Sequence, residues 1–257
     1  MAVILYTQPE IEKVRDAGRL TAEVFALLGE RIKPGVTTKE LDRVAEHYIR
    51  KHGATPAYKG YKPRFASRPF PATICASVND VICHGFPSDK PLKDGDIIGV
   101  DIGLDLKGWY GDACVTYAVG TLAPETARLL KVAEESMWRG IGAAQPAKRI
   151  GDIGAAIQTY VEANGFSVVR EWSGHGVGRK LHEDLSIPHH GKPGTLQKLL
   201  PGMIFTIEPM VNVGAPDMYV DRRDGWTVRT VDGSLSAQYE HSIVITDHGP
   251  ELLTKIG

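Results

Sequence analysis

The sequence predicts a protein of mixed α/β class, α+β in its order along the chain, and three observations support this. Amphipathic helical patterns open the chain, β-branched runs separated by Gly, Pro and Asp follow from about residue 72 to 119, and a helical pattern returns near residue 124. One helical stretch also recurs 112 residues later, which predicts two similar halves facing each other across a cleft. With 257 residues, the chain can form one large domain or two small ones.

Capping signatures predict two helices before residue 55. Thr7 and Glu10 form a capping box ahead of apolar residues at helical spacing. Thr37 and Glu40 repeat the signature, and Gly53 is placed to end the second helix in a left-handed conformation.

The second of these helical stretches has a counterpart later in the chain. Residues 33–53 align without a gap on residues 145–165, and the alignment preserves the apolar phase and the closing glycine. Each copy also follows a helical pattern and precedes strands. Two unrelated amphipathic helices of similar length remain the alternative, because identities are few. The repeat predicts a single domain, residues 1–257, built from halves of about 8–120 and 121–250.

Charge and hydropathy exclude several classes of function. The net charge is -1 and both signs are well mixed, so the chain has no basic footprint for nucleic acid or an anionic membrane. No apolar run approaches the roughly 18 residues of a membrane helix, and the apolar start MAVILY is too short for a signal peptide. Three cysteines without CxxC spacing favour free thiols in a reducing compartment. We therefore expect a cytoplasmic protein.

Asp101 and Asp112 flank a predicted hairpin. The sequence DLKG at 105–108 has Asp first and Gly fourth, as a type I turn prefers. Pairing about the middle of this turn sets Asp101 directly opposite Asp112, with β-carbons about 4.5–5.5 Å apart, unless a bulge at Gly108 shifts the register by one residue. Two facing carboxylates require a shared proton, a basic residue or a cation. An exposed hairpin with two hydrated aspartates is the alternative.

Three further polar side chains stand in surroundings that normally hold apolar ones. Glu208 and Glu240 interrupt segments typical of buried strands, 203–207 and 243–245, and neither flank offers Lys or Arg. His175 lies between glycines in GHGVG, where backbone and ligand can approach closely. Taken singly, each has an ordinary alternative: a hydrated glutamate at a strand end, or a histidine satisfied by backbone.

Together these five side chains predict a shared metal site. Four carboxylates and one imidazole carry a formal charge of -4, which two divalent cations balance. Such a set suits Mn²⁺, Fe²⁺, Co²⁺ or Zn²⁺ and argues against a structural thiolate zinc site. Two ions about 3.5–4 Å apart can activate a shared water for attack on a carbonyl, so hydrolysis is the expected reaction. The predicted ligands are Asp101, Asp112, His175, Glu208 and Glu240.

The chain closely resembles the type I methionine aminopeptidases over nearly its whole length. The resemblance rests on SVNDVICHGFP at 77–87, VDIG and GWYGDA at 100–113, SGHGVGRKLHE at 173–183, GMIFTIEPM at 202–210, and DGWTV and SLSAQYEHSIVIT at 224–246. It implies the pita-bread fold, a pseudo-twofold α/β arrangement with a curved antiparallel sheet covered by helices. It also implies a dinuclear metal site with the same five ligands, in which Asp112 and Glu240 touch both ions.

By the same resemblance, His84 and His182 contact the substrate. We expect His84 to meet the peptide's amino end or the scissile amide nitrogen, and His182 to hydrogen-bond the carbonyl oxygen and steady the tetrahedral intermediate. Glu208 is expected to carry a proton from the activated water to the leaving amine.

The other histidines are expected to be ordinary. His241 adjoins Glu240, but strand alternation points it to the opposite face. The remaining five belong to a helix, a loop or a terminal turn: His47, His52, His189, His190 and His248.

The resemblance also implies an apolar, closed pocket for the methionine side chain, lined by Tyr61, Phe70, Cys75 and Trp226. Leu181 stands where many relatives have Phe before the second histidine, and residues 62–68 look like an insertion beside the pocket. Because Leu still packs a thioether, we expect altered affinity rather than altered chemistry.

The predicted function is removal of the initiator methionine from nascent proteins whose second residue is small. The enzyme would be a monomer that associates transiently with the ribosome, uses two divalent ions (Co, Mn, Fe or Zn), and binds neither membrane nor a specific nucleic-acid sequence. One alternative is an Xaa-Pro aminopeptidase or dipeptidase, which usually has a large extra amino-terminal domain; here the first predicted helix begins at about residue 8. The other is a non-catalytic ribosome-binding protein of the same fold, which would be free to lose ligands.

Overall fold

We describe the protein from a computed structural model, in which residues 3–63 and 66–255 are described. The helices in these residues are α1 (Gln8–Gly29), α2 (Thr38–Lys51), α3 (Pro124–Ala143) and α4 (Ile150–Ala163). The strands are β1 (Thr55–Pro56), β2 (Cys75–Val78), β3 (Val81–Cys83), β4 (Ile97–Leu106), β5 (Trp109–Ala118), β6 (Ser167–Val168), β7 (Ser173–Gly176), β8 (Glu183–Pro188), β9 (Ile204–Ile207), β10 (Met210–Asn212), β11 (Met218–Val220), β12 (Val228–Thr230), β13 (Ser236–Gln238), β14 (Glu240–Thr246) and β15 (Gly249–Leu252).

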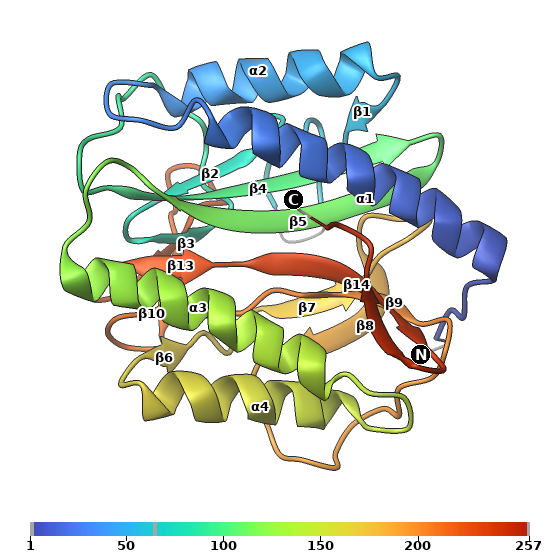
Figure 1. The fold of residues 1–257 in the computed structure, drawn as a ribbon. Coiled ribbons are helices and arrows are strands. Elements are labelled where there is room, and N and C mark those ends of the chain that lie inside the picture. Colours follow the sequence, from blue (N-terminus) through green and yellow to red (C-terminus); the bar gives the residue numbers. More distant parts are fainter. Residues whose placement is uncertain (1–2, 64–65, 256–257) are drawn as a thin grey trace.

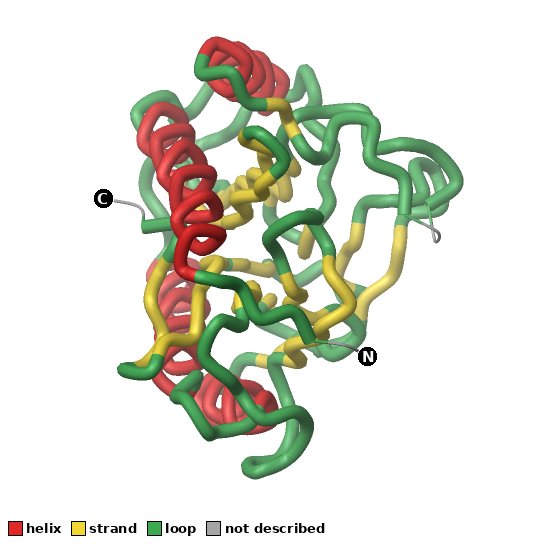
Figure 2. The backbone as a smooth tube through the Cα atoms, turned by 90° about the vertical axis from the view of Figure 1, so that its right-hand side faces the viewer, coloured by secondary structure: helices red, strands yellow, loops and turns green. Residues whose placement is uncertain are grey.

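One large antiparallel sheet forms the centre of the fold. Its main order is β1-β4-β5-β14-β9-β7-β8, with β2 also paired to β4 and β15 to β14. Two smaller sheets, β13-β10-β6 and β11-β12-β3, adjoin it. Figure 1 shows α1 and α2 on one half of this assembly and α3 and α4 on the other, and Figure 2 shows the helices together on one side of the strands. The expected class, a curved antiparallel sheet covered by helices, is confirmed.

Each helix pair packs on its own part of the large sheet. Residues of α1 and α2 form a buried cluster with β4, including Val24, Leu41 and Val100. Residues of α3 and α4 form a second cluster with β9 and β14, including Phe205 and Ile243. Burial of these apolar faces drives the packing of helices on the sheet. In the described part of the chain, no helix combines the length and apolarity that a membrane span requires.

The structure confirms both predicted capping boxes. The Glu10 carboxylate accepts the Thr7 amide over 3.0 Å, and the Glu40 carboxylate accepts the Thr37 amide over 2.8 Å. Gly53 has a φ of 74° after α2. These contacts satisfy amide groups that would otherwise lack partners at the first turn of each helix.

The two helices of the predicted repeat, α2 and α4, begin and end at equivalent positions. α2 and α4 each span 14 residues, and both bounds of α4 lie 112 residues after those of α2. Gly165 has a φ of 76° after α4, as Gly53 does after α2. The residue before each helix, Thr37 or Arg149, also forms an isolated bridge to a later segment. These features support the proposal of two similar halves in a single domain.

The β4–β5 hairpin corrects one prediction. Asp101 lies opposite Cys114, and Asp112 lies opposite Gly103, so the two aspartates are diagonal rather than directly opposed. The loop consists of Lys107 and Gly108, with φ values of 57° and 83°, rather than the expected DLKG type I turn. Two positive φ values suit a type I′ loop, whose twist matches that of the strands it joins. The shift by two positions keeps both carboxylates on one face.

Candidate metal centre and substrate pocket

The sheet register aligns acidic side chains across the seam between the two helix pairs. Cys75 of β2 pairs with Asp101 of β4, which pairs with Cys114 of β5, which pairs with Glu240 of β14. Residues directly opposite in antiparallel strands point to the same face. Because Val100 and Ile102 pack on the helices, this row faces the opposite side of the sheet.

Asp101 and Asp112 meet at one phenol group. The Tyr58 hydroxyl lies 2.5 Å from Asp101 Oδ1 and 2.7 Å from Asp112 Oδ1. The other oxygen of Asp112, Oδ2, lies 3.5 Å from His175 Nε2. Asp112 therefore joins Asp101 on one side and His175 on the other.

His175 presents one ring nitrogen to the acidic cluster. Its Nδ1 lies 3.0 Å from the Gly176 carbonyl, which can only accept, so Nδ1 carries the proton. Its Nε2 lone pair then faces Asp112 and also Glu208 Oε1, at 3.5 Å. Burial lowers the pKa of His175 to about 3, so the ring is neutral at neutral pH.

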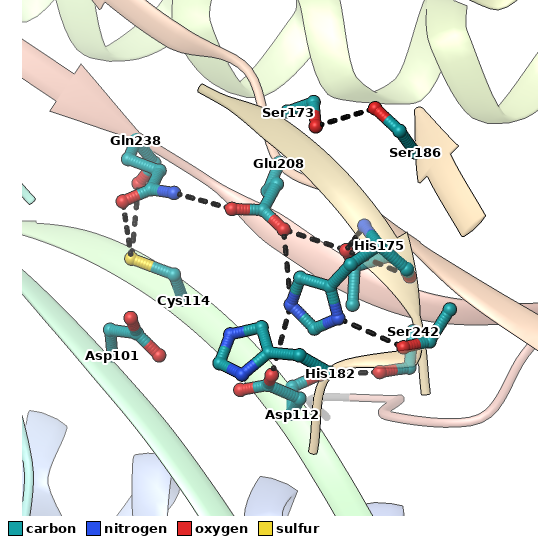
Figure 3. A network of polar contacts seen from close by, with 12 residues as sticks. Asp101, Asp112, Cys114, Ser173, His175, His182, Ser186, Glu208, Gln238 and Ser242 are labelled. Carbon is teal, nitrogen blue, oxygen red and sulfur yellow. Dashed lines mark hydrogen bonds and ion pairs between the residues drawn. The ribbon is translucent and has the colours of Figure 1, made fainter. Parts of the chain in front are cut away.

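Both oxygens of Glu208 are held by neighbouring side chains. The Thr206 hydroxyl donates to Oε1 over 2.6 Å, and the Gln238 amide donates to Oε2 over 3.2 Å. Figure 3 shows Glu208 between Gln238 and His175, on the side of the cluster away from Asp101. The Glu208 amide donates to His189 Nε2 over 3.1 Å, which also fixes the backbone.

Glu240 completes the cluster and leaves one oxygen without a protein partner. Its Oε1 is buried and forms no hydrogen bond with any residue that the structure describes. One ligand atom each from Asp112, His175 and Glu240 lie within 4.8 Å of one another. Leaving a buried carboxylate oxygen unpaired is costly, so the position favours a positively charged ligand.

The carboxylates perturb one another because they share a buried site. Burial raises the pKa of Asp101 to about 7 and that of Glu208 to about 8. Burial and the neighbouring carboxylates raise the pKa values of Asp112 and Glu240 well above the ordinary range. Among the described residues that line the adjoining cavity, there is no Lys or Arg to neutralise them.

These observations fit a divalent cation. The donors are carboxylate oxygens and one imidazole nitrogen with a free lone pair, a set that suits Mn²⁺, Fe²⁺, Co²⁺ or Zn²⁺. A cation would supply the charge that the surrounding side chains lack and a partner for Glu240 Oε1. The structure brings together all five predicted ligands, since each lines the same cavity.

The cavity beside the cluster has a volume of about 320 Å³. Aromatic residues form much of its apolar lining: the Phe70 ring lies edge-on to Trp226, with centroids 5.1 Å apart. Cys75 also lines the cavity. The sequence-predicted residues on its wall are Tyr61, Phe70, Cys75, His84, His182 and Trp226.

The two predicted substrate histidines enter this cavity from different elements. His84 follows β3, and its ring lies edge-on to Trp172 and Trp226, with centroids 5.0 and 5.9 Å away. Burial lowers the pKa of His84 to about 4. His182 lies 4.2 Å from His175, centroid to centroid, and its Nδ1 is 2.9 Å from the Tyr61 hydroxyl.

Leu181 and the described residues of the segment 62–68 lie at or beside the cavity, and Pro63 lines it. Leu181 is buried in one apolar cluster with Tyr58 and Phe70 but does not line the cavity itself. Within 62–68, residues 64 and 65 lie outside the described part. Arg68 is described: its Nε donates to the Asp224 carbonyl over 3.1 Å, and its own carbonyl accepts the Trp226 indole N–H over 2.8 Å.

His189, expected to be ordinary, bonds to the backbone beside the site. His189 follows β8 in a loop, as predicted, but it is fully buried and accepts the Glu208 amide. His241 does point away from Glu240's face: its Nδ1 lies 3.0 Å from Thr254 Oγ1. His248 is exposed in a turn, as expected.

Several residues around the cluster escaped the sequence analysis. Thr206 and Gln238 each lie two residues before a predicted ligand, and strand alternation could have marked both as neighbours on the same face. Tyr58 and His189 carried no such signal, because loop segments bring them to the site.

Comparisons with known proteins agree on one family. The family model for metallopeptidase family M24 matches residues 12–247. A methionine aminopeptidase of Clostridium perfringens (strain 13 / Type A) is 49% identical over 254 residues, covering 99% of each chain. The crystal structure of methionine aminopeptidase from Rickettsia prowazekii superimposes with a TM-score of 0.95 at 44% identity, over 99% of this chain and 100% of that one.

A structure with a different described activity is similar in fold. The Xaa-Pro dipeptidase from Bacillus anthracis superimposes with a TM-score of 0.77 at 24% identity. It covers 98% of this chain, whereas this chain covers 62% of that one.

Proposed function

The chain belongs to metallopeptidase family M24, among its methionine aminopeptidases, and we propose on this basis that it removes the initiator methionine from newly made proteins whose second residue is small. The convergence of four carboxylates and one neutral imidazole beside an apolar cavity carries the proposal. The preference for a small second residue rests on the family alone.

We assign metal binding to Asp101, Asp112, His175, Glu208 and Glu240. The unpartnered Glu240 oxygen and the absence of Lys and Arg among the described cavity residues support this assignment. When bound, divalent cations lower the pKa of a coordinated water and polarise the scissile carbonyl. The number of ions, two in our proposal, follows from the formal charge of the ligand set.

The cavity would hold the methionine side chain against aromatic surfaces. Phe70, Trp226 and Tyr61 offer ring faces and edges, which suit a polarizable thioether. Seating the side chain there fixes the first peptide bond beside the carboxylates, and such positioning lowers the entropy cost of reaction.

Three side chains would handle protons and the carbonyl oxygen. Glu208 takes a proton from the attacking water and passes it to the leaving amine, with its orientation held by Thr206. His182, whose Nδ1 lies 2.9 Å from the Tyr61 hydroxyl, hydrogen-bonds the carbonyl oxygen through its other ring nitrogen, Nε2. His84, neutral because its pKa is lowered to about 4, contacts the amide nitrogen or amino end.

The cellular setting completes the proposal. We propose a cytoplasmic monomer that meets nascent chains through transient contact with the ribosome. The nascent amino terminus is its peptide partner, which the activity of the relatives supports.

The decisive experiment compares peptides on chelator-treated protein reconstituted with Mn²⁺ or Co²⁺. We expect cleavage of Met-Ala-Ser, little cleavage of Met-Trp-Ser, and none of Ala-Pro-Ala. Elemental analysis combined with activity titration for each metal would identify the ion and its stoichiometry. Preferential cleavage of Ala-Pro-Ala would favour an Xaa-Pro peptidase, and failure to cleave any Met-peptide with any metal would favour a binding protein.

A further inference from the structure

Tyr58 lies in the segment between β1 and β2, which share one edge of β4. β1 pairs through Pro56 with Leu104, and the next amide, of Ala57, donates to the Gly103 carbonyl over 2.9 Å. The chain thus leaves the edge of β4 directly before Tyr58. Backbone pairing, rather than a flexible loop, sets where this side chain begins.

Gly103 makes room for the Tyr58 ring. A β-carbon at position 103 would lie 3.0 Å from Tyr58 Cζ and 3.0 Å from Leu181 Cδ1. Gly103 stands opposite Asp112 and two residues from Asp101, so the missing side chain leaves space between the two aspartates. Phe70 contacts the ring edge-on, with centroids 6.1 Å apart. Packing therefore fixes the ring, and the ring places the hydroxyl.

The Tyr58 hydroxyl contacts only one of the two carboxylate oxygens of Asp112. It engages Oδ1 of Asp112 at 2.7 Å and Oδ1 of Asp101 at 2.5 Å. Oδ2 of Asp112 remains free to face His175. A carboxylate with one oxygen held rotates less freely, so its other oxygen is presented in one orientation.

We propose that Tyr58 is a positioning residue that orients Asp101 and Asp112 for the cation. The inference rests on the proposed metal site and adds a group that hydrogen-bonds the ligands without binding the ion. Removing such a partner of a metal ligand typically weakens metal binding about 10–100-fold.

Tyr58→Phe tests this inference, because it removes one oxygen and keeps the ring that packs on Phe70 and Leu181. Calorimetric titration of the metal-free protein with Mn²⁺ is expected to give a Kd about 10–100 times that of wild type. An unchanged Kd would show that the hydroxyl plays no positioning role. A lower Kd would show that it competes with the ion, which also overturns the inference.

Tyr48→Phe is the matched control. Its hydroxyl also donates to a carboxylate, Glu23 at 3.0 Å, but on the exposed surface of α2. Its Kd for Mn²⁺ is expected to equal that of wild type.

Unfolding of the variant and failure of the wild type to bind metal have different consequences. If metal-free Tyr58→Phe protein unfolds before titration, the Mn²⁺ concentration that restores its melting temperature replaces the Kd, and a requirement no greater than that of wild type overturns the inference. Wild-type protein that bound no Mn²⁺ would overturn the proposed function together with this inference. Wild-type binding with an unaltered variant would overturn the inference alone.

Discussion

His84 has a backbone φ of 57°, in the left-handed region that residues with a β-carbon seldom adopt. It directly follows β3, and its ring lies edge-on to both Trp172 and Trp226. Conformations of this kind cost about 1–3 kcal/mol and persist where the surrounding structure enforces them. The indole rings and the strand before it do so here, at the wall of the substrate cavity.

His84→Ala should therefore lower turnover without releasing metal. Tyr58 hydrogen-bonds two of the predicted metal ligands, whereas the His84 ring lines the substrate cavity. We expect kcat/KM on Met-Ala-Ser to fall about 10²–10³-fold, the range typical when one hydrogen-bonding group at the reacting atoms is removed. Metal content by elemental analysis should match wild type.

His248→Ala, in an exposed turn, is the control and should change neither quantity. Loss of metal together with activity in His84→Ala would mean that His84 has a structural role.

The β4–β5 hairpin carries both predicted aspartates, so its loop controls where they stand. Lys107 and Gly108 both have positive φ values, and the Asp105 carboxylate accepts the Gly108 amide over 2.6 Å. The register that follows places Asp112 opposite Gly103, which leaves the space that Tyr58 fills.

Gly108→Ala isolates the cost of this turn. A β-carbon at position 108 would meet nothing within 4 Å, so the penalty arises from the backbone conformation alone. We expect the free energy of unfolding in urea to fall by about 1–2 kcal/mol.

Gly142→Ala is matched to this change. It also meets nothing within 4 Å, but it lies in α3 and has no positive φ, so it should stabilise by about 0.5–1 kcal/mol. Equal stability of Gly108→Ala and wild type would show that the loop adopts another turn at no cost.

At the seam between the two halves of the sheet, strands of both halves contribute to one acidic cluster. β4 and β5 belong to the half that α1 and α2 cover, and β7 and β14 belong to the other half. β5 meets β14 at the pair Cys114 and Glu240, which is where the two parts of the large sheet join. Assembly of the whole molecule therefore buries four carboxylates together. Metal and protons compete to neutralise them.

Chelation should make stability depend on pH in a defined direction. Burial raises the pKa of Asp101 from 3.8 to about 7 and that of Glu208 from 4.5 to about 8. A raised pKa means that the folded protein holds protons that the unfolded chain releases. The stability that proton binding by these two carboxyl groups gives the folded protein is therefore complete below about pH 4, and it is lost as pH rises through 7 to 8.

The melting temperature in EDTA should accordingly fall between about pH 5 and pH 8, whereas Mn²⁺ should raise it and flatten its dependence. Scanning fluorimetry over this range, with and without Mn²⁺, measures both curves. Parallel curves would contradict the assignment of these carboxylates to a metal site.

Local signals in the sequence were enough to locate the helices and to single out the ligand candidates. A capping box at Thr7 or Thr37 and a closing glycine at Gly53 act within a few residues, since the hydrogen bonds of a helix close over one turn. Acidic residues inside apolar runs, such as Glu240, indicated a shared site because burying them singly is costly.

Tertiary structure alone decided how those side chains meet. The hairpin register depends on loop twist, so Asp101 faces Cys114 and not Asp112. Tyr58 reaches the aspartates because β1 pairs with β4, and His189 reaches the Glu208 amide because the end of β8 lies close to the end of β9. Such contacts join residues far apart in the chain, and their energies depend on complementary packing, which no local pattern of residues encodes.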